Sequence, residues 1–252
     1  MSGHSKWSQI KRKKGKADQE RGRLFGKLIR EITIAARDGG GAPDGNPRLR
    51  AAIQTAKDNA MPASNIERAI KKGTGELPGT SYEEHSYEGY APGGVALIID
   101  VLTDNKNRTT SEIRHTFTRA GGNMGENGCV SWMFEERGSI LVDRKVCDED
   151  AIIEVAAEAG ALDVNTEADD VYEVLTRPGD LHQVARFLDK KSIPHHDVRQ
   201  TKVPTTTVLL DRDTAGKVLK LIEALEEQDD TQNVWANFDI PDEIMASLTS
   251  AA

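Results

Sequence analysis

The first 80 residues show apolar positions at the spacing of α-helices. A helix is predicted over residues 21–37, because its apolar residues share one face and three consecutive glycines follow it. Asn46 and Pro47 suit the cap and the first turn of a second helix, which runs through Ala60. A third short helix ends at Gly73. The predicted inward positions of the three helices are Leu24, Leu28, Ile32 and Ala35, then Leu49, Ile53 and Ala56, then Ile66, Ala69 and Ile70.

After residue 80 the pattern changes to short strands that alternate with helices. Residues 95–102 are predicted to be a strand, and they are too apolar for an exposed sheet face. The Asp-x-x-Gln pattern at Asp180 predicts a capping box at the start of a helix. The alternation predicts an α+β protein, with a helical N-terminal domain followed by two small α/β domains that each pack a sheet against helices. The other predicted strands are 131–134, 138–142, 171–175, 205–210 and 234–240. Further helices are predicted after the turn 103–108, after Asp148 and over residues 218–225. Domain breaks are expected near Phe134 and Pro204.

The composition is that of a polar globular protein. Apolar residues make up 37% and charged residues 29% of the 252 residues. The longest aliphatic run, Val95 to Ile99, is far shorter than the roughly 20 residues of a membrane-spanning helix. The first residues lack the apolar stretch of a secretory signal, and two cysteines, Cys129 and Cys147, are too few for a disulfide framework. We therefore expect a cytoplasmic protein without a membrane segment.

Charge is distributed unevenly along the chain. Residues 1–80 hold 17 Lys and Arg against 8 Asp and Glu, a balance of +9, whereas the remaining residues carry −17. Six of the basic residues precede the first acid, Asp18, in a segment that we call the basic arm, residues 1–17. Such a block is typical of contact with a phosphate backbone, although a solvated terminus or a targeting peptide has the same composition. The predicted nucleic-acid-binding residues are Lys6, Trp7, Lys11, Arg12, Lys13, Lys14 and Lys16 in the arm, with Arg23, Lys27 and Arg30 on the first helix.

No set of residues in the sequence points to catalysis. The chain lacks a phosphate-binding Gly-x-x-x-x-Gly-Lys-Ser/Thr loop, a Gly-x-Ser-x-Gly elbow and a His-Glu-x-x-His metal helix. The adjacent histidines of 195–197 would point to opposite faces of a strand and could not readily share a metal. Asp100 and Asp104 fit a solvated capping turn better than acid/base work, and Cys129 fits a small buried residue. We expect no enzyme, metal, cofactor or small-molecule substrate.

Four glycines lie within the eight residues 121–128. Glycine loses much conformational freedom on folding, so a special backbone conformation or a close approach must explain them. The segment contains the Gly-x-x-Gly spacing with which certain RNA-binding loops hold a nucleotide backbone, and a wide surface turn is the alternative. The candidate functional residues of this loop are Gly122, Asn123, Met124 and Gly125.

Six motifs follow one another along the chain. They are Gly3-His-Ser-Lys-Trp, Lys27-Leu-Ile-Arg-Glu-Ile, Asn46-Pro-Arg-Leu-Arg, Asn65-Ile-Glu-Arg-Ala-Ile-Lys-Lys-Gly, Tyr87-Glu-Gly-Tyr-Ala-Pro-Gly-Gly-Val-Ala and Val130-Ser-Trp-Met-Phe. With these motifs the chain resembles the YebC/PmpR family, to which the mitochondrial translational activator of cytochrome c oxidase also belongs. One departure lies in the arm, where Arg12-Lys-Lys-Gly-Lys-Ala-Asp-Gln-Glu replaces the more usual stretch with histidine and alanine. The charge is retained, so phosphate contact is still expected, whereas a helical arm is not.

The resemblance implies three domains and a non-enzymatic role in gene expression. The domains would be a basic helical domain with its arm (1–80), a middle α/β domain of two segments (81–134 and 205–240) and a third α/β domain (135–204). Members of the family are usually described as probable transcriptional regulators that bind DNA. Others are described as translation factors for ribosomes stalled at proline-rich sequences, which would make ribosomal RNA and tRNA the partners. The acidic body suits contact through one end of the molecule only, because broad packing along a duplex would be repelled; the family description favours the DNA hypothesis and this charge layout slightly favours the ribosome hypothesis.

Overall fold

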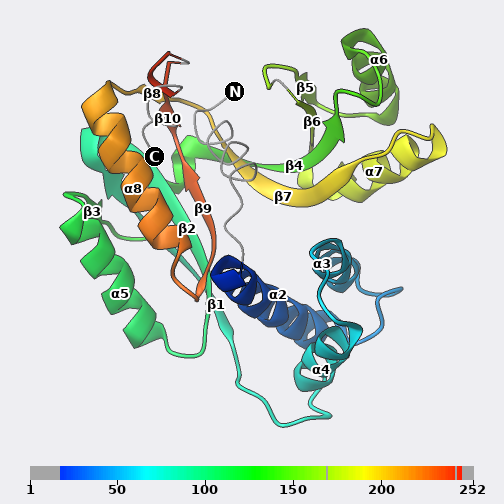
Figure 1. The fold of residues 1–252 in the computed structure, drawn as a ribbon, viewed down its shortest axis with the longest axis horizontal. Helices are drawn as coiled ribbons and strands as arrows, with labels where there is room; N and C mark the ends of the chain where they lie inside the picture. Colours follow the sequence, from blue (N-terminus) through cyan, green and yellow to red (C-terminus); the bar gives the residue numbers. More distant parts are fainter. Residues whose placement is uncertain (1–17, 169, 242, 246–252) are drawn as a thin grey trace. The chain divides into compact units, whose positions relative to one another are not determined.

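The computed structural model describes residues 18–168, 170–241 and 243–245, which fall into two compact units (Figure 1). One unit holds residues 133–206, and the other holds the described residues before 133 and after 206. Each unit has a four-stranded sheet of its own. The fold is α+β, as predicted, with a helical region ahead of the two sheets. Among the described helices, none combines the length and the apolar character needed to cross a membrane.

The helical region is a three-helix core. The Asn46 side chain accepts a hydrogen bond from the Leu49 amide at 3.0 Å, which confirms the predicted cap. Its amide group also donates to the carbonyls of Ala35 and Gly40, so the cap of one helix is tied to the end of another. Leu24 is 37% exposed, because the apolar core of the three helices begins after it; its predicted inward position is wrong. The helices are α2 (Asp18–Gly39), α3 (Pro47–Asp58) and α4 (Ala63–Gly73).

The same unit contains an antiparallel sheet in the strand order β3-β1-β2-β9. The central strand β2 is buried along almost its whole length, as its apolar sequence predicts. Helices α5 and α8 pack beside each other against this sheet (Figure 1). A short parallel pair of strands, β8 and β10, completes the unit. The elements are β1 (Glu83–Ala91), β2 (Val95–Thr103), α5 (Lys106–Arg119), β3 (Asn123–Met124), β8 (Val208–Leu209), α8 (Arg212–Glu226), β9 (Thr231–Ala236) and β10 (Phe238–Asp239).

The unit of residues 133–206 has the strand order β5-β6-β4-β7, with all neighbours antiparallel. Its core joins Ile140 and Val174 of the sheet to Ile152 and Leu188 of the two helices. Asp148 caps α6 by accepting from the Ala151 amide at 2.9 Å, as predicted. The elements are β4 (Phe134–Asp143), α6 (Glu149–Ala159), β5 (Asp163–Asn165), β6 (Val171–Thr176), α7 (Leu181–Lys190) and β7 (His196–Pro204).

Several predicted elements differ from the structure. Residues 134–143 form one strand rather than two, because β7 pairs with the charged stretch Glu135–Arg137 and lets the strand continue through it. The capping box at Asp180 is wrong: this residue has helical backbone angles, whereas a cap needs an extended backbone, and its side chain makes no capping hydrogen bond. The β-branched stretch 205–210 yields only the two-residue strand β8.

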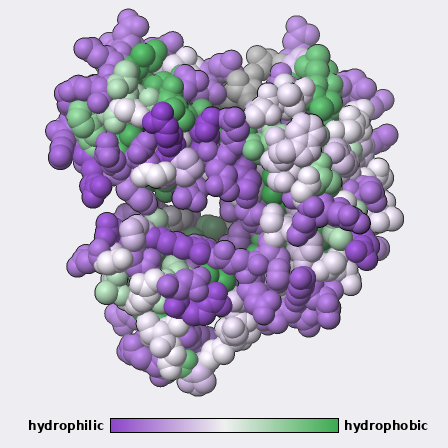
Figure 2. All heavy atoms as spheres, turned by 180° about the vertical axis from the view of Figure 1, so that it is seen from behind, coloured by the Kyte–Doolittle hydropathy of each residue, from purple (hydrophilic) through white to green (hydrophobic). Residues whose placement is uncertain are grey.

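The surface agrees with the polar composition. The face drawn in Figure 2 is mostly hydrophilic, and its hydrophobic residues gather in small groups. The exposed large apolar side chains of the described residues include Trp132 and Leu209, which are each 70% exposed.

Candidate nucleic-acid interface

The predicted nucleic-acid-binding residues divide into two sets. Seven of them, Lys6, Trp7, Lys11, Arg12, Lys13, Lys14 and Lys16, lie outside the described residues. The other three, Arg23, Lys27 and Arg30, lie on α2, where their spacing places them on one face of the helix. Only this second set has a described environment.

The first two of these three cations, Arg23 and Lys27, contact the C-terminal end of α8. The Lys27 ammonium donates to the backbone carbonyl of Glu226 at 2.7 Å, and the Arg23 guanidinium lies 3.5 Å from the Glu227 carboxylate. The last carbonyls of a helix lack partners within the helix and carry partial negative charge, so they suit cations. These two side chains therefore have electrostatic partners inside the molecule.

Arg30, the third of these cations, contacts the residues that follow α8. Its guanidinium donates to the backbone carbonyl of Asp229, lies 3.4 Å from the Asp230 carboxylate and stacks 5.7 Å from the centre of the Tyr82 ring. The structure thus brings all three predicted cations of α2 to one acidic segment, residues 226–230. Sequence reasoning identified the cations but not this partner, which lies about 200 positions further along the chain.

Asp230 is the centre of the polar network at this contact. It is 4% exposed and accepts hydrogen bonds from Arg108 at 2.7 Å, from Thr109 at 2.7 Å and from Thr103 at 3.0 Å. Burial by itself raises the pKa of this carboxyl group, but the hydrogen bonds and the charge of Arg108 outweigh it and hold the pKa below its usual value. Asp230 is therefore an ionised, fully engaged carboxylate.

Two properties of glycine explain the glycine-rich loop: Gly121 and Gly128 adopt left-handed backbone angles, with φ of 77° and 91°, whereas Gly122 and Gly125 approach other parts of their own chain closely. Asn123 and Met124 form the edge strand β3, which pairs with β1. A Cβ atom on Gly122 would lie 2.7 Å from the carbonyl oxygen of Tyr90, and one on Gly125 would lie 2.5 Å from the Cys129 sulfur. The expected close approach exists, and the partner is the protein itself. The functional role predicted for residues 122–125 stays a prediction.

Glu88 of β1 fixes the end of this loop. Its carboxylate is 6% exposed and accepts from the backbone amides of Gly128 at 2.8 Å, Val130 at 2.7 Å and Ser131 at 2.9 Å. Burial raises the pKa of Glu88, but the three amide hydrogen bonds outweigh this effect and lower the pKa below its ordinary value. Sequence reasoning missed Glu88, although a lone glutamate between the strand tyrosines Tyr87 and Tyr90 was a usable signal.

The same loop holds Trp132 at the surface. The carbonyl of Cys129 accepts from the Trp132 indole at 3.1 Å and from the Tyr90 hydroxyl at 3.1 Å. Cys129 is half-buried rather than buried, so the predicted small buried residue is only partly enclosed. Burial, followed by the charge of Glu88, raises the pKa of the Cys129 thiol. This thiol is therefore a poor nucleophile.

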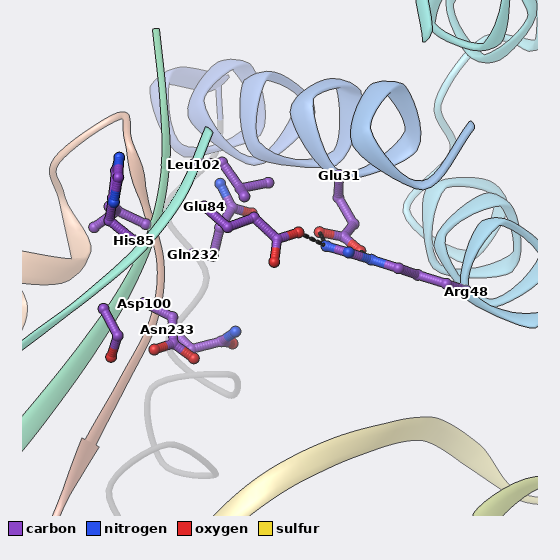
Figure 3. Close-up of a pocket in the computed structure, with 10 residues that line it drawn as sticks. Glu31, Arg48, Glu84, His85, Asp100, Leu102, Gln232 and Asn233 are labelled. Atoms are coloured by element: carbon purple, nitrogen blue, oxygen red, sulfur yellow. Dashed lines mark hydrogen bonds and ion pairs between the residues drawn. The ribbon is translucent and has the colours of Figure 1, made fainter. Parts of the chain in front are cut away.

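A polar cavity of about 270 Å³ lies between the helical region and the sheet of the same unit (Figure 3). Arg48 of α3 bridges two carboxylates at its edge, Glu31 at 2.7 Å and Glu84 at 2.5 Å, and these contacts raise the pKa of Arg48. Asp100 adds a third carboxylate to the lining. With more acids than bases, this cavity does not suit a phosphate group. Within the described ranges, no group of three or more His, Cys, Asp or Glu residues is arranged to hold a metal ion.

Comparisons with known proteins cover nearly the whole chain. Residues 5–76 match the TACO1/YebC protein N-terminal domain, and residues 82–238 match the TACO1/YebC second and third domain. A relative from Syntrophus aciditrophicus is 56% identical over 251 residues, which are 99% of this chain and 100% of that protein. A relative from Persephonella marina is 54% identical over 250 residues, with the same coverage. Both are named "probable transcriptional regulatory protein".

A solved structure shows the same fold. The crystal structure of a conserved hypothetical protein from Aquifex aeolicus matches with a TM-score of 0.85 and 53% sequence identity. The match covers 91% of this chain and 95% of that one. A fold with a helical region and two α/β units is therefore shared with an experimentally determined structure.

Proposed function

For this chain, which belongs to the TACO1/YebC family, we propose the function of a cytoplasmic, non-enzymatic, DNA-binding regulator of transcription. The regulatory part of the proposal rests on the names of the relatives. The DNA-binding part rests on one observation of this chain, the separation of charge. Residues 1–80 carry a balance of +9 and the rest of the chain carries −17, so a polyanion is attracted by the first part of the sequence and repelled by the remainder.

In this proposal the basic arm makes the main contacts with the phosphate backbone. Its six Lys and Arg residues precede the first acid, and each neutralised phosphate releases a condensed counterion. Trp7 adds a flat ring that can stack on a base. Arg23, Lys27 and Arg30 contribute only when a phosphate replaces their partners on the 226–230 segment. The division into domains 1–80, 81–134 with 205–240, and 135–204 is part of the same proposal.

Contacts of this kind position a protein on DNA without reading its sequence. We therefore expect the purified chain to bind duplex DNA with a strong dependence on salt and a weak dependence on sequence. The candidate loop residues Gly122, Asn123, Met124 and Gly125 are proposed to act after this step, in the contact with a regulatory target.

The test is a salt titration of binding to a fluorescein-labelled DNA duplex, followed by anisotropy. The four-fold variant Lys11→Ala, Arg12→Ala, Lys13→Ala, Lys14→Ala should lower the slope of log affinity against log salt by about 0.9 for each phosphate that the arm no longer neutralises. A control with substitutions only on α8 should keep the slope of the unmodified chain. An unchanged slope in the arm variant would overturn the role of the arm.

Crosslinking in cells, with sequencing of the attached DNA and RNA, tests the identity of the target. Recovery of promoter fragments supports the proposal. Recovery of ribosomal RNA and tRNA without DNA would overturn it and would support the alternative, a translation factor that acts on ribosomes stalled at proline-rich sequences.

A further inference from the structure

Helix α4 carries three cations on one solvent-facing side. Arg68, Lys71 and Lys72 are spaced so that they are neighbours on the helix surface, with Cβ atoms about 5–6 Å apart. All three are exposed, and among the described residues none of them has an ion-pair or hydrogen-bond partner for its charged group. This arrangement differs from that of Arg23, Lys27 and Arg30 on α2, which all contact the 226–230 segment.

The cations of α4 are held on a rigid support. The opposite side of the helix is buried against α2 through Ile66 and Ala69. At its C-terminal end, a Cβ atom on Gly73 would collide with the backbone carbonyl of Thr33, so the two helices are in direct backbone contact. The hydroxyl of Thr33, which donates to the carbonyl of Ile29 at 2.7 Å, also lies 3.3 Å from the carbonyl of Ala69. The three charges are therefore displayed at fixed positions along the helix.

Capping of the helix does not account for them. The last carbonyls of α4 already accept backbone amides: Ile70 from Thr74 at 2.9 Å, Lys71 from Leu77 at 3.1 Å and Lys72 from Gly75 at 3.3 Å. The helix dipole favours cations in the last turn, where Lys71 and Lys72 lie, but it does not account for Arg68, which lies a turn earlier. The patch therefore carries more positive charge than the stability of the helix requires.

We propose that Arg68, Lys71 and Lys72 form a phosphate-backbone contact site, which we call the α4 patch, in addition to the basic arm. Its ligand class is the sugar-phosphate backbone of a nucleic acid. The inference rests on the proposed function and deepens it, because it assigns the contact to described residues that sequence reasoning did not single out. Arg23, Lys27 and Arg30 would have to leave the 226–230 segment before they could bind a phosphate, whereas the three α4 cations would not have to break such a contact.

The test compares two variants of the full chain with equal changes in charge. One is Arg68→Ala, Lys71→Ala, Lys72→Ala. The matched control is Arg212→Ala, Lys217→Ala, Lys220→Ala, in which one Arg and two Lys are removed from exposed positions of α8. Alanine is the best helix former, so both variants should keep the circular dichroism and the melting temperature of the unmodified chain.

Binding is measured by anisotropy with a labelled DNA duplex and with an RNA duplex of the same sequence, over a series of salt concentrations. The α4 variant should lower the salt slope on the preferred duplex by about 0.9 for each phosphate left without its cation, up to about 2.7, with little dependence on sequence. The control should not change the slope. A variant that keeps the charges, Arg68→Lys, Lys71→Arg, Lys72→Arg, should restore it. The duplex on which the slope falls identifies the nucleic acid.

The outcomes separate this inference from the proposed function. If the unmodified chain binds and the arm variant has a reduced slope while the α4 variant matches its control, the α4 patch is refuted and the proposed function stands. If the α4 variant has a reduced slope and the arm variant does not, the patch is supported and the arm is refuted. If the unmodified chain binds neither duplex, both the proposed function and the patch are refuted.

Discussion

Removal of the Glu88 carboxylate should release the end of the glycine-rich loop. In the substitution Glu88→Ala, the amides of Gly128, Val130 and Ser131 lose their common acceptor. Val130 is fully buried, whereas Gly128 and Ser131 are exposed and can bond to water instead. The buried amide should therefore account for most of the cost.

The magnitude follows from these environments. One buried amide without a partner costs about 1–3 kcal/mol, and each of the two exposed amides loses a net hydrogen bond worth about 0.5–1.5 kcal/mol. Part of this cost is recovered when the loop relaxes toward water, so we expect a local loss of about 2–4 kcal/mol. Glu88→Gln keeps one acceptor oxygen but loses the charge, and it should cost about half as much.

Hydrogen exchange measured by mass spectrometry on the peptide that covers residues 128–131 is the assay. A local loss of about 2–4 kcal/mol corresponds to exchange roughly 30-fold to 1,000-fold faster at neutral pH. The control is Glu126→Ala in the same loop, where the side chain is exposed, and exchange should not change. Exchange in Glu88→Ala within a few-fold of the unmodified chain would refute the role of Glu88.

The same residue predicts a dependence on pH. Because the folded state lowers the pKa of Glu88, its contribution to stability is complete above the ordinary pKa of glutamate and is lost as the pH falls through the lowered value. Acid should therefore reduce the protection of the loop in the unmodified chain, measured as its exchange rate relative to the intrinsic rate of an unfolded peptide at the same pH. In Glu88→Gln this additional acid effect should be absent. Equal acid effects in the two proteins would contradict the assignment.

Three further predictions concern other described residues. Asp230→Ala removes the buried acceptor of a guanidinium and two threonines, and should lower the free energy of unfolding in urea by about 2–4 kcal/mol, whereas the exposed Asp104→Ala should cost under about 1 kcal/mol. Gly73→Ala should lower the melting temperature by overpacking against the Thr33 carbonyl, at a cost of about 1–3 kcal/mol; an unchanged or higher melting temperature would contradict the contact. Cys129 should react with iodoacetamide at neutral pH more slowly than a free thiol, because its pKa is raised. Mass spectrometry measures the rate of alkylation, and a rate above that of a free thiol would contradict the prediction.

Elements defined by local signals could be predicted from the sequence. The Asn46 cap, the Asp148 cap and the buried strand β2 each depend on residues close together in the chain. Strand β7 was missed because its burial is mixed, and its identity as a strand depends on pairing with β4, about 60 positions earlier. Local patterns do not contain that information.

In the candidate site, too, local features could be predicted from the sequence and contacts between distant residues could not. Positive charge at the start of the chain is visible in the composition, but whether a given cation is free depends on distant partners. Arg30 meets the carbonyl of Asp229 across 199 positions, and Glu88 meets the amide of Val130 across 42. The α4 cations were overlooked because the sequence does not show which cations meet a partner in the fold. In the part of the chain that the structure describes, no ion-pair partner is seen for Arg68, Lys71 or Lys72.

The placement of β9 has a consequence for biosynthesis. Strand β2 pairs with β1, which is made just before it, but its other neighbour comes from near the end of the chain; Ala96 and Asn237, which share a hydrogen bond, are 141 positions apart. The unit of residues 133–206 emerges in between and has all its strands before β9 is translated. A polypeptide that stops after residue 206 therefore leaves one edge of its most apolar strand without a partner, which is a template for aggregation.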